Sequence, residues 1–222
     1  KTQVDPHKLD AIKHLGPPPT RPAPSASANS PVKANKPAPK PILVEDPDDM
    51  PALLGNGQLL SLDVVWTLRA HIPHRFKYHD WKLAFSTSVN GTSLLTFYKL
   101  LEKKSPTILV IRDTDGHLFG GFASEPWQIS KGFFGTGESF LFSILPAFAV
   151  YTWTTADDYF LLAKREFLAM GGGGTSGRYG LWLDSELSAG TSEVCKTFLN
   201  RRLSLTEEFK VSSLEVYSLE PK

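Results

Sequence analysis

Two stretches of the chain carry apolar residues at helical spacing. The first predicts a helix over residues 61–72, which begins at the candidate N-cap Ser61 and ends before Pro73. The second predicts a helix over residues 93–102, capped by Thr92 or Ser93. The apolar stripes are Leu62, Val65, Trp66, Leu68 and Ile72 in the first helix, and Leu94, Phe97, Tyr98 and Leu101 in the second.

The other patterns between residues 81 and 219 are typical of short strands. Residues 81–87 alternate apolar and polar side chains, and the apolar run 107–111 is joined to residues 117–122 by a strong hairpin turn at 113–116. Further strands are predicted at 138–144, 148–154, 158–163, 179–184 and 208–219, and the imperfect alternation of the last indicates a bulge. Because no helical crossovers separate the strands, we expect an α+β, mostly β fold, in which two antiparallel sheets pack as a β-sandwich with flanking helices.

Composition divides the chain into two parts. No Phe, Trp or Tyr precedes Trp66, whereas twelve of the 17 prolines lie between Pro6 and Pro51. A segment without aromatic residues cannot bury enough apolar surface to offset the entropy of ordering it. We therefore predict a disordered, proline-rich tail or linker over residues 1–55 and a folded domain over 56–222. The tail is interpreted first as a spacer, and alternatively as a docking site for a reader of proline-rich motifs.

Charge and cysteine usage narrow the class of protein. The formal net charge is +1, and the mildly basic tail turns acidic at residues 45–49. Since the tail also has no aromatic residue to stack on a base, we expect no binding to nucleic acid. Cys195 is the single cysteine, no apolar run is long enough to span a bilayer, and no signal-peptide pattern opens the chain. These features favour a cytoplasmic protein without direct membrane insertion, and a start at Lys1 indicates part of a longer protein.

The segment from Gly132 to Phe142 combines three glycines and one acid with four aromatic residues. Glycines at this spacing favour a tight turn, which we expect to lead into a core strand through Phe140 and Phe142. The carboxylate of Glu138 then either accepts hydrogen bonds from nearby backbone N–H groups, which is slightly favoured, or is presented to a partner. The two roles are compatible if the fixed turn is itself the contact surface.

Other patterns resemble chemical sites but have simpler interpretations. The run 171–178 lacks the Gly-Lys-Ser or Gly-Lys-Thr of a phosphate loop, so a flexible turn is favoured. Cys195 is interpreted as a buried small side chain, with a nucleophile or an oxidisable sensor as alternatives. The cluster His71, His74, His79 and Asp80 matches no zinc spacing, and the acid pairs Asp113 with Asp115 and Asp184 with Glu186 are explained by turn chemistry. We expect no metal, no cofactor and no catalytic residues.

Several segments, taken in order, resemble the TLDc domain family. The central match is 133–142, followed by 177–184 with its Gly-Arg-Tyr-Gly-Leu-Trp-Leu-Asp. Residues 81–87 and 91–94 match the opening of the family, and 111–113 with 119–122 match its hairpin. Thr197-Phe198 and residues 214–216 complete the similarity, which covers about 58–220. The family usually has two asparagines after the Thr-Phe pair, whereas here Leu199 replaces the first and only Asn200 remains.

The resemblance implies a β-sandwich flanked by helices and a eukaryotic protein of the oxidation-resistance group. It further implies a non-enzymatic binding module that protects against oxidative stress, and that binds subunits of the vacuolar proton-pumping ATPase and regulates its assembly or activity. Such a protein would be cytoplasmic and recruited to vacuolar, lysosomal or other acidic-organelle membranes. The alternative is a Cys195-dependent antioxidant or peroxide sensor. The residues singled out are Gly135, Thr136, Gly137, Glu138 and Asp184 for partner binding, Gly120, Gly121, Gly177 and Gly180 for turns, and Cys195 for redox chemistry.

Overall fold

The computed structural model describes residues 50–174 and 177–222. The prediction for the proline-rich tail up to residue 49 therefore lies outside the described residues, as do Thr175 and Ser176 of the glycine run. The last residues of the predicted tail are described and contain a strand, β1 (Leu53–Leu54), which pairs in parallel with β2. The sequence did not predict β1, because two residues paired with a distant strand leave no periodic signal.

Both predicted helices are present. The first, α1 (Leu62–Arg69), is capped by the Ser61 side chain and ends three residues earlier than predicted. The second, α3 (Leu94–Leu101), is capped by the Ser93 side chain and buries its predicted apolar stripe. Two short helices were not predicted, the 3₁₀ helix η3 (His74–Phe76) and α2 (Thr87–Asn90).

Besides β1, the strands follow the predicted positions with two additions, β8 and β10. Both strands are short, and their own residues show no clear alternation of apolar and polar side chains. The bounds of the strands after β1 are β2 (Asp80–Ser86), β3 (Thr107–Asp113), β4 (Leu118–Ala123), β5 (Phe140–Leu145), β6 (Ala149–Tyr151), β7 (Leu161–Ala163), β8 (Phe167–Met170), β9 (Leu181–Asp184), β10 (Ala189–Thr191) and β11 (Glu208–Glu220).

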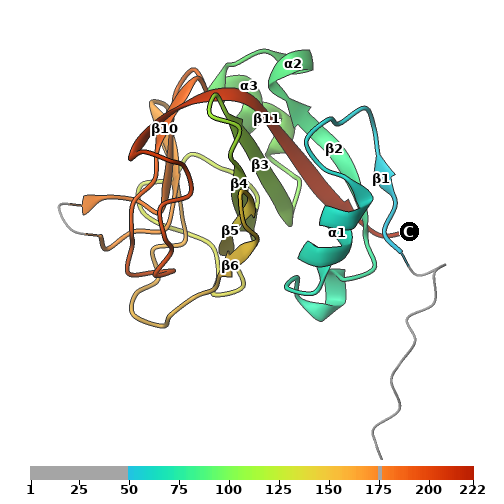
Figure 1. The fold of residues 1–222 in the computed structure, drawn as a ribbon, viewed down its shortest axis with the longest axis horizontal. Coiled ribbons are helices and arrows are strands. Elements are labelled where there is room, and N and C mark those ends of the chain that lie inside the picture. The colour runs from blue at the N-terminus through green and yellow to red at the C-terminus, as the bar shows by residue number, and fades with distance from the viewer. Residues whose placement is uncertain (1–49, 175–176) are drawn as a thin grey trace, which may run out of the picture. The chain divides into compact units, whose positions relative to one another are not determined.

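The long strand β11 belongs to two sheets (Figure 1). Its first residues, 208–210, pair with β10 and continue into β9, β8 and β7, which we call sheet B. Residues 211–220 pair with β3 on one side and β2 on the other, in sheet A, which runs β1-β2-β11-β3-β4-β5-β6. Register shifts within β11 confirm the bulge predicted from its imperfect alternation. Apart from the β1–β2 pair, all of these pairings are antiparallel.

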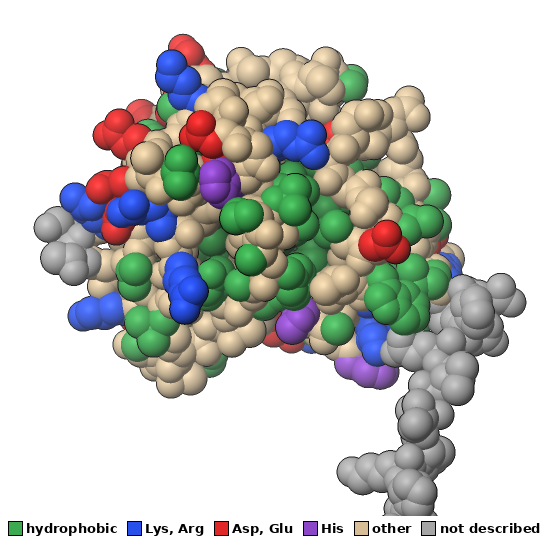
Figure 2. Space-filling view, in the orientation of Figure 1, with side chains coloured by type: hydrophobic (Ala, Val, Ile, Leu, Met, Phe, Trp, Pro, Cys, Tyr) green, Lys and Arg blue, Asp and Glu red, His purple; other side chains and the backbone are tan. Residues whose placement is uncertain are grey.

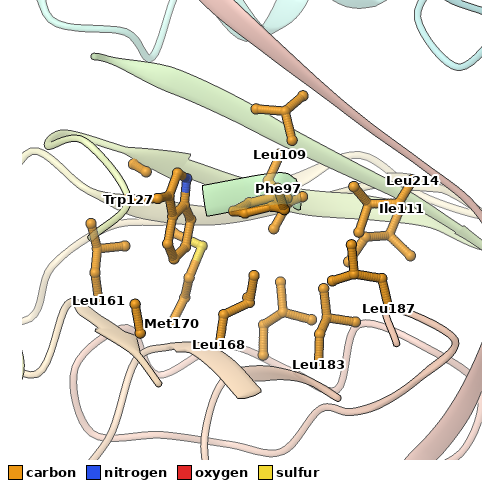
Figure 3. Packing of buried hydrophobic residues seen from close by; sticks show 14 of the residues in the cluster. Phe97, Leu109, Ile111, Trp127, Leu161, Leu168, Met170, Leu183, Leu187 and Leu214 are labelled. Carbon is orange, nitrogen blue, oxygen red and sulfur yellow. The ribbon is translucent and has the colours of Figure 1, made fainter. Parts of the chain in front are cut away.

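The main core lies between the two sheets. Leu109, Ile111 and Leu214 of sheet A face Leu168 and Leu183 of sheet B (Figure 3). Phe97 of α3 packs edge-on against Trp127 within the same cluster. A second cluster lies on the other face of sheet A, where α1 covers residues such as Val110, Phe122 and Phe142. The molecule is therefore an α+β, mostly β fold with two packed antiparallel layers and helices at their flanks.

Gly120 and Gly121 are strand residues and not turn residues, which corrects the sequence prediction. Both are buried in β4, where they pair with Val110 and Leu109 of β3. A Cβ atom on Gly120 would lie 1.8 Å from the Leu109 carbonyl oxygen, and one on Gly121 would lie 2.5 Å from Sδ of Met170. The glycines allow this close approach of the neighbouring strand and of the core, which no local pattern reveals.

A buried carboxylate attaches the start of the domain to β11. Oε1 of Glu215 accepts a 2.8 Å hydrogen bond from the Gln58 backbone N–H, and Oε2 accepts one of 3.0 Å from that of Leu59. The Tyr217 hydroxyl also donates to Oε2, at 2.6 Å. Burial and the adjacent carboxylate raise the pKa of Tyr217, so its hydroxyl remains a donor. The segment before α1 is thus held by one side chain, which lies 157 positions from Gln58 and 156 from Leu59 in the sequence.

Replacing this carboxylate should destabilise the domain strongly. We expect Glu215→Ala to lower the free energy of unfolding in urea by about 3 kcal/mol, since two backbone N–H groups and one hydroxyl lose a charged acceptor. Glu208→Ala, an exposed position on the same strand, is the matched control and should change stability by less than about 0.5 kcal/mol. Equal effects of the two substitutions would contradict this role for Glu215.

Candidate functional site

The turn at Gly135–Glu138 is fixed by the core on one side and by serine side chains on the other. Phe134 forms a two-way backbone bridge with Leu161 of β7, with N···O distances of 2.9 Å. Gly135 follows with φ of +99°, a conformation that favours glycine. The Thr136 N–H donates to Oγ of Ser124 at 2.9 Å. The predicted turn is therefore present, and it enters β5 through the buried Phe140 and Phe142 as expected.

Gly137 is required by a neighbouring aromatic ring. A Cβ atom here would lie 2.2 Å from Cε3 of Trp153, so the indole covers the backbone of the turn directly. The indole N–H of Trp153 donates to the Asp157 carbonyl oxygen at 2.6 Å, which fixes the ring in this place. A contact between residues from two loops explains this glycine, and no local pattern in the sequence indicates that Trp153 contacts the turn.

Glu138 forms an exposed ion pair with Arg75 of η3. Both carboxylate oxygens accept from the two terminal nitrogens of the guanidinium, in a bidentate arrangement. The side chains remain open to solvent, with relative exposures of 57% for Arg75 and 34% for Glu138. Glu138 thus accepts from a side chain, which corrects the expectation that its carboxylate binds backbone N–H groups.

The pair makes this part of the surface sensitive to acid. The hydrogen bond from Arg75 lowers the pKa of Glu138, against the smaller opposing effect of burial. A carboxyl group whose pKa is lower in the folded state contributes stability above its unfolded pKa and loses it as pH falls through the folded pKa. The pair therefore persists at neutral pH and breaks only in acid. Because both side chains are solvated, its contribution to stability is small.

Asp184 lies apart from this turn. It ends β9, and its two carboxylate oxygens accept from the Ser188 backbone N–H at 2.9 Å and the Ser188 hydroxyl at 3.0 Å. Leu161, which contacts the turn, is linked through Met170 to the opposite end of β9. The structure therefore does not bring the two predicted contact regions together, and the Asp184 side chain closes the β9–β10 turn.

Cys195 is buried in a polar network rather than in a reactive site. Its thiol lies 3.1 Å from Oδ1 of Asn200, whose amide donates to the Glu193 carbonyl at 2.8 Å. Burial raises the pKa of the Cys195 thiol to about 11. A peroxide-reactive cysteine needs a shift in the opposite direction, so the geometry weighs against the redox hypothesis.

Leu199, which stands where the family usually has asparagine, adopts a left-handed backbone conformation with φ of +45°. Asparagine tolerates this region, whereas a leucine there is strained. The side chain is 64% exposed, so burial does not compensate for the strain. The retained Asn200 is fully buried and provides the hydrogen bonds of the loop.

The described glycines of the run 171–178 pack against this network. The Gly172 N–H donates to the Thr197 hydroxyl at 2.9 Å, and the Lys196 N–H donates to the Gly172 carbonyl at 2.9 Å. Gly177 has φ of +74°, and its N–H donates to the Gly174 carbonyl oxygen at 3.2 Å. Gly180 directly precedes β9 and lies against Cys195. The first part of the run is therefore anchored rather than flexible, because Thr197 and the segment around it bind its backbone.

The remaining candidates for chemistry are occupied by structural contacts. Buried Asp113 accepts from the N–H groups of Asp115 and His117 and from the Ser204 hydroxyl. Across residues 50–174 and 177–222, no three His, Cys, Asp or Glu side chains are grouped as a metal site. Within the same residues, every helix is too short or too polar to cross a membrane.

A buried and protonated Cys195 thiol should react slowly with an alkylating reagent. In the full chain at pH 8, iodoacetamide should alkylate folded Cys195 about a hundredfold more slowly than the same thiol in urea, because a pKa of about 11 leaves little thiolate. Cys195→Ser controls for labelling elsewhere. Rapid oxidation of the folded thiol by peroxide would overturn the assignment.

The strain at Leu199 should be relieved by the residue that the family prefers. We expect Leu199→Asn to raise the free energy of unfolding by about 0.5–1 kcal/mol in chemical denaturation. Leu205→Asn is the matched control, since Leu205 is 65% exposed and is not among the residues with positive φ. If both substitutions have the same effect, backbone strain is not the cause.

Comparison with known proteins gives consistent matches across the folded part. The family model of the TLDc domain matches residues 53–220. Oxidation resistance protein 1 of Homo sapiens is 42% identical over 171 residues, which cover 77% of this chain and 19% of that protein. Nuclear receptor coactivator 7 of Homo sapiens is 41% identical over 177 residues, covering 79% and 19% respectively.

These relatives are much longer than the chain. Oxidation resistance protein 1 of Rattus norvegicus is 38% identical over 190 residues, or 85% of this chain and 22% of that protein. The chain therefore spans about a fifth of the length of the curated relatives that it matches. Since the family model matches well over half of the chain and the relatives share about two residues in five with it, the chain belongs to the TLDc domain family.

Proposed function

We propose that this domain is a non-catalytic binding module that associates with the vacuolar proton-pumping ATPase and regulates its assembly or activity. Through that association it contributes to resistance against oxidative stress. The proposal is supported by membership of the TLDc family and by similarity to proteins named Oxidation resistance protein 1. It acts in the cytoplasm and reaches vacuolar, lysosomal or other acidic-organelle membranes by binding the pump.

The exposed ion pair of Arg75 and Glu138 on an immobilised turn is the observation that carries the proposal. An isolated solvated pair adds little to stability, so holding the fold together is a weak reason for it. A rigid turn, in contrast, presents charges to a partner without a further cost in conformational entropy. The turn is held by Ser124, Leu161 and Trp153, which belong to three separate segments. It therefore has the preorganisation that a contact surface needs.

The side chains that offered catalytic chemistry are used elsewhere, which supports a binding role. The Cys195 thiol is protonated at neutral pH, and the Asp113 carboxylate is surrounded by donors. Asp184 is engaged by Ser188 and is therefore not included in the proposed contact surface.

Charge reversal separates a contact role from a structural role for the pair. We expect Glu138→Arg to weaken capture of the pump by the full chain about tenfold or more, because it places like charges against Arg75 and inverts the presented charge. The double variant Arg75→Glu/Glu138→Arg restores an ion pair with opposite polarity. Binding should stay weak in the double variant if the pump reads the charges, and should recover if the pair only fixes the turn.

A second ion pair supplies the control. The side chains of Lys82 and Glu220 are 53% and 36% exposed, close to those of Arg75 and Glu138, although Glu220 also pairs with Lys104. The single charge reversal Lys82→Glu, which likewise places like charges together, should leave capture unchanged. Pull-down with purified pump subunits, with and without nucleotide, is the measurement. If the parent chain captures no subunit under any nucleotide condition, the proposal is wrong.

A further inference from the structure

The outer face of sheet B carries a row of aromatic side chains. Leu168, Met170 and Leu183 point into the core (Figure 3), so strand alternation directs Phe167 and Trp182 outward. The rings continue one against the next beyond the strand ends. We call this row the aromatic ladder: Tyr159 and Phe133 stack at 4.6 Å between ring centroids, followed by Phe133–Tyr179 at 6.4 Å, Tyr179–Phe167 at 5.9 Å and Phe167–Trp182 at 6.0 Å.

The ladder is not covered by other parts of the described chain. Tyr159 is 41% exposed, and the other four rings are half-buried. Among the described residues, the indole N–H of Trp182 has no hydrogen-bond acceptor. An indole N–H that becomes buried normally needs a hydrogen-bond acceptor. Since this one has none within the described chain, it is available to donate to a ligand that covers the ring.

Two hollows flank Trp182, because its neighbours across the sheet are small. Thr191 is its register partner on β10, and Ala189 lies two positions along on the same face. The larger hollow has a volume of about 590 Å³ and the smaller about 260 Å³. Trp182 and Thr191 line both hollows, so the indole of Trp182 lies between the two hollows.

The rim of the two hollows is acidic. Asp115 and Glu208 border the larger hollow together with Lys210, whereas Glu193 and Glu207 border the smaller together with Arg178. Arg178 is already shared by the two glutamates of its own hollow. Charged side chains of both signs gather over the β10 side of the molecule (Figure 2). Within the described residues, Asp115 and Glu208 have no cationic partner.

We propose that the aromatic ladder is a docking surface for a proline-rich segment of a partner protein that carries Lys or Arg next to its prolines. Proline rings pack on flat aromatic surfaces, and polyproline II backbone is already extended, so little entropy is lost on binding. Its carbonyl groups have no internal hydrogen bonds and accept from the Trp182 indole. The basic side chains pair with Asp115 and Glu208, and the same carboxylates disfavour a phosphate backbone.

The test uses the full chain and a fluorescein-labelled peptide with the core Lys-Pro-Ala-Pro-Lys-Pro, followed by fluorescence anisotropy. We expect Trp182→Ala to weaken binding about tenfold or more. Thr191→Arg, which keeps the indole but fills both hollows, should do the same in a protein with unchanged thermal stability. Trp66→Ala, a 44% exposed tryptophan on α1, is the matched control and should bind like the parent.

The chain itself contains the sequence Lys-Pro-Ala-Pro-Lys-Pro at residues 36–41, so a protein with Pro37, Pro39 and Pro41 replaced by Ala excludes competition. A peptide with alanine in place of every proline should bind at least about fivefold more weakly, which tests the polyproline requirement. Glu208→Lys should weaken binding of the basic peptide but not of one with Lys replaced by Ala. Equal binding of the alanine peptide, an unchanged affinity in Trp182→Ala, or preference for a labelled oligothymidine would each overturn the proposal.

Discussion

The fold depends on one strand being shared by two sheets. β11 pairs with β10 through its first residues and with β2 and β3 through the rest, so it fixes how the two layers face each other. The change of sheet occurs where the register of β11 shifts against β3, between Val211 and Ser213. Such an irregularity bends a strand and increases its twist. Glu215, next along the same strand, then binds the segment before α1 and closes the other face of sheet A.

Both surfaces described above follow from this packing. The core between the sheets takes the alternate residues of β8 and β9, and their neighbours Phe167 and Trp182 are therefore directed outward into the aromatic ladder. The turn at Gly135–Glu138 is bridged to β7 at the edge of sheet B, while Arg75 reaches it from η3, next to sheet A. The ion pair thus joins segments 63 positions apart in the sequence. The ladder and the pair are chemically different, one aromatic with an acidic rim and the other a compact pair of opposite charges.

The backbone of the loop around Cys195 explains why the family has asparagine at the positions of Leu199 and Asn200. The sequence showed only that Leu199 departs from the family and that Asn200 is kept. The backbone explains both, since position 199 is left-handed and Asn200 supplies buried hydrogen bonds to Cys195 and Glu193. Burial of Cys195 raises the pKa of its thiol, and a single cysteine in a sequence gives no indication of that shift.

Local patterns were sufficient for the α3 stripe, the α1 start, the 113–116 turn and the bulged last strand, because each depends on neighbours a few residues away. The motifs in order were also sufficient for the family, which the match over residues 53–220 confirms. Only the tertiary structure decided that Gly120 and Gly121 lie within a strand, that β1 pairs with β2, that Glu138 meets Arg75 and that five aromatic rings form one ladder. Each of these depends on contacts between distant segments, and a side chain's periodicity carries no information about which distant residue it will meet.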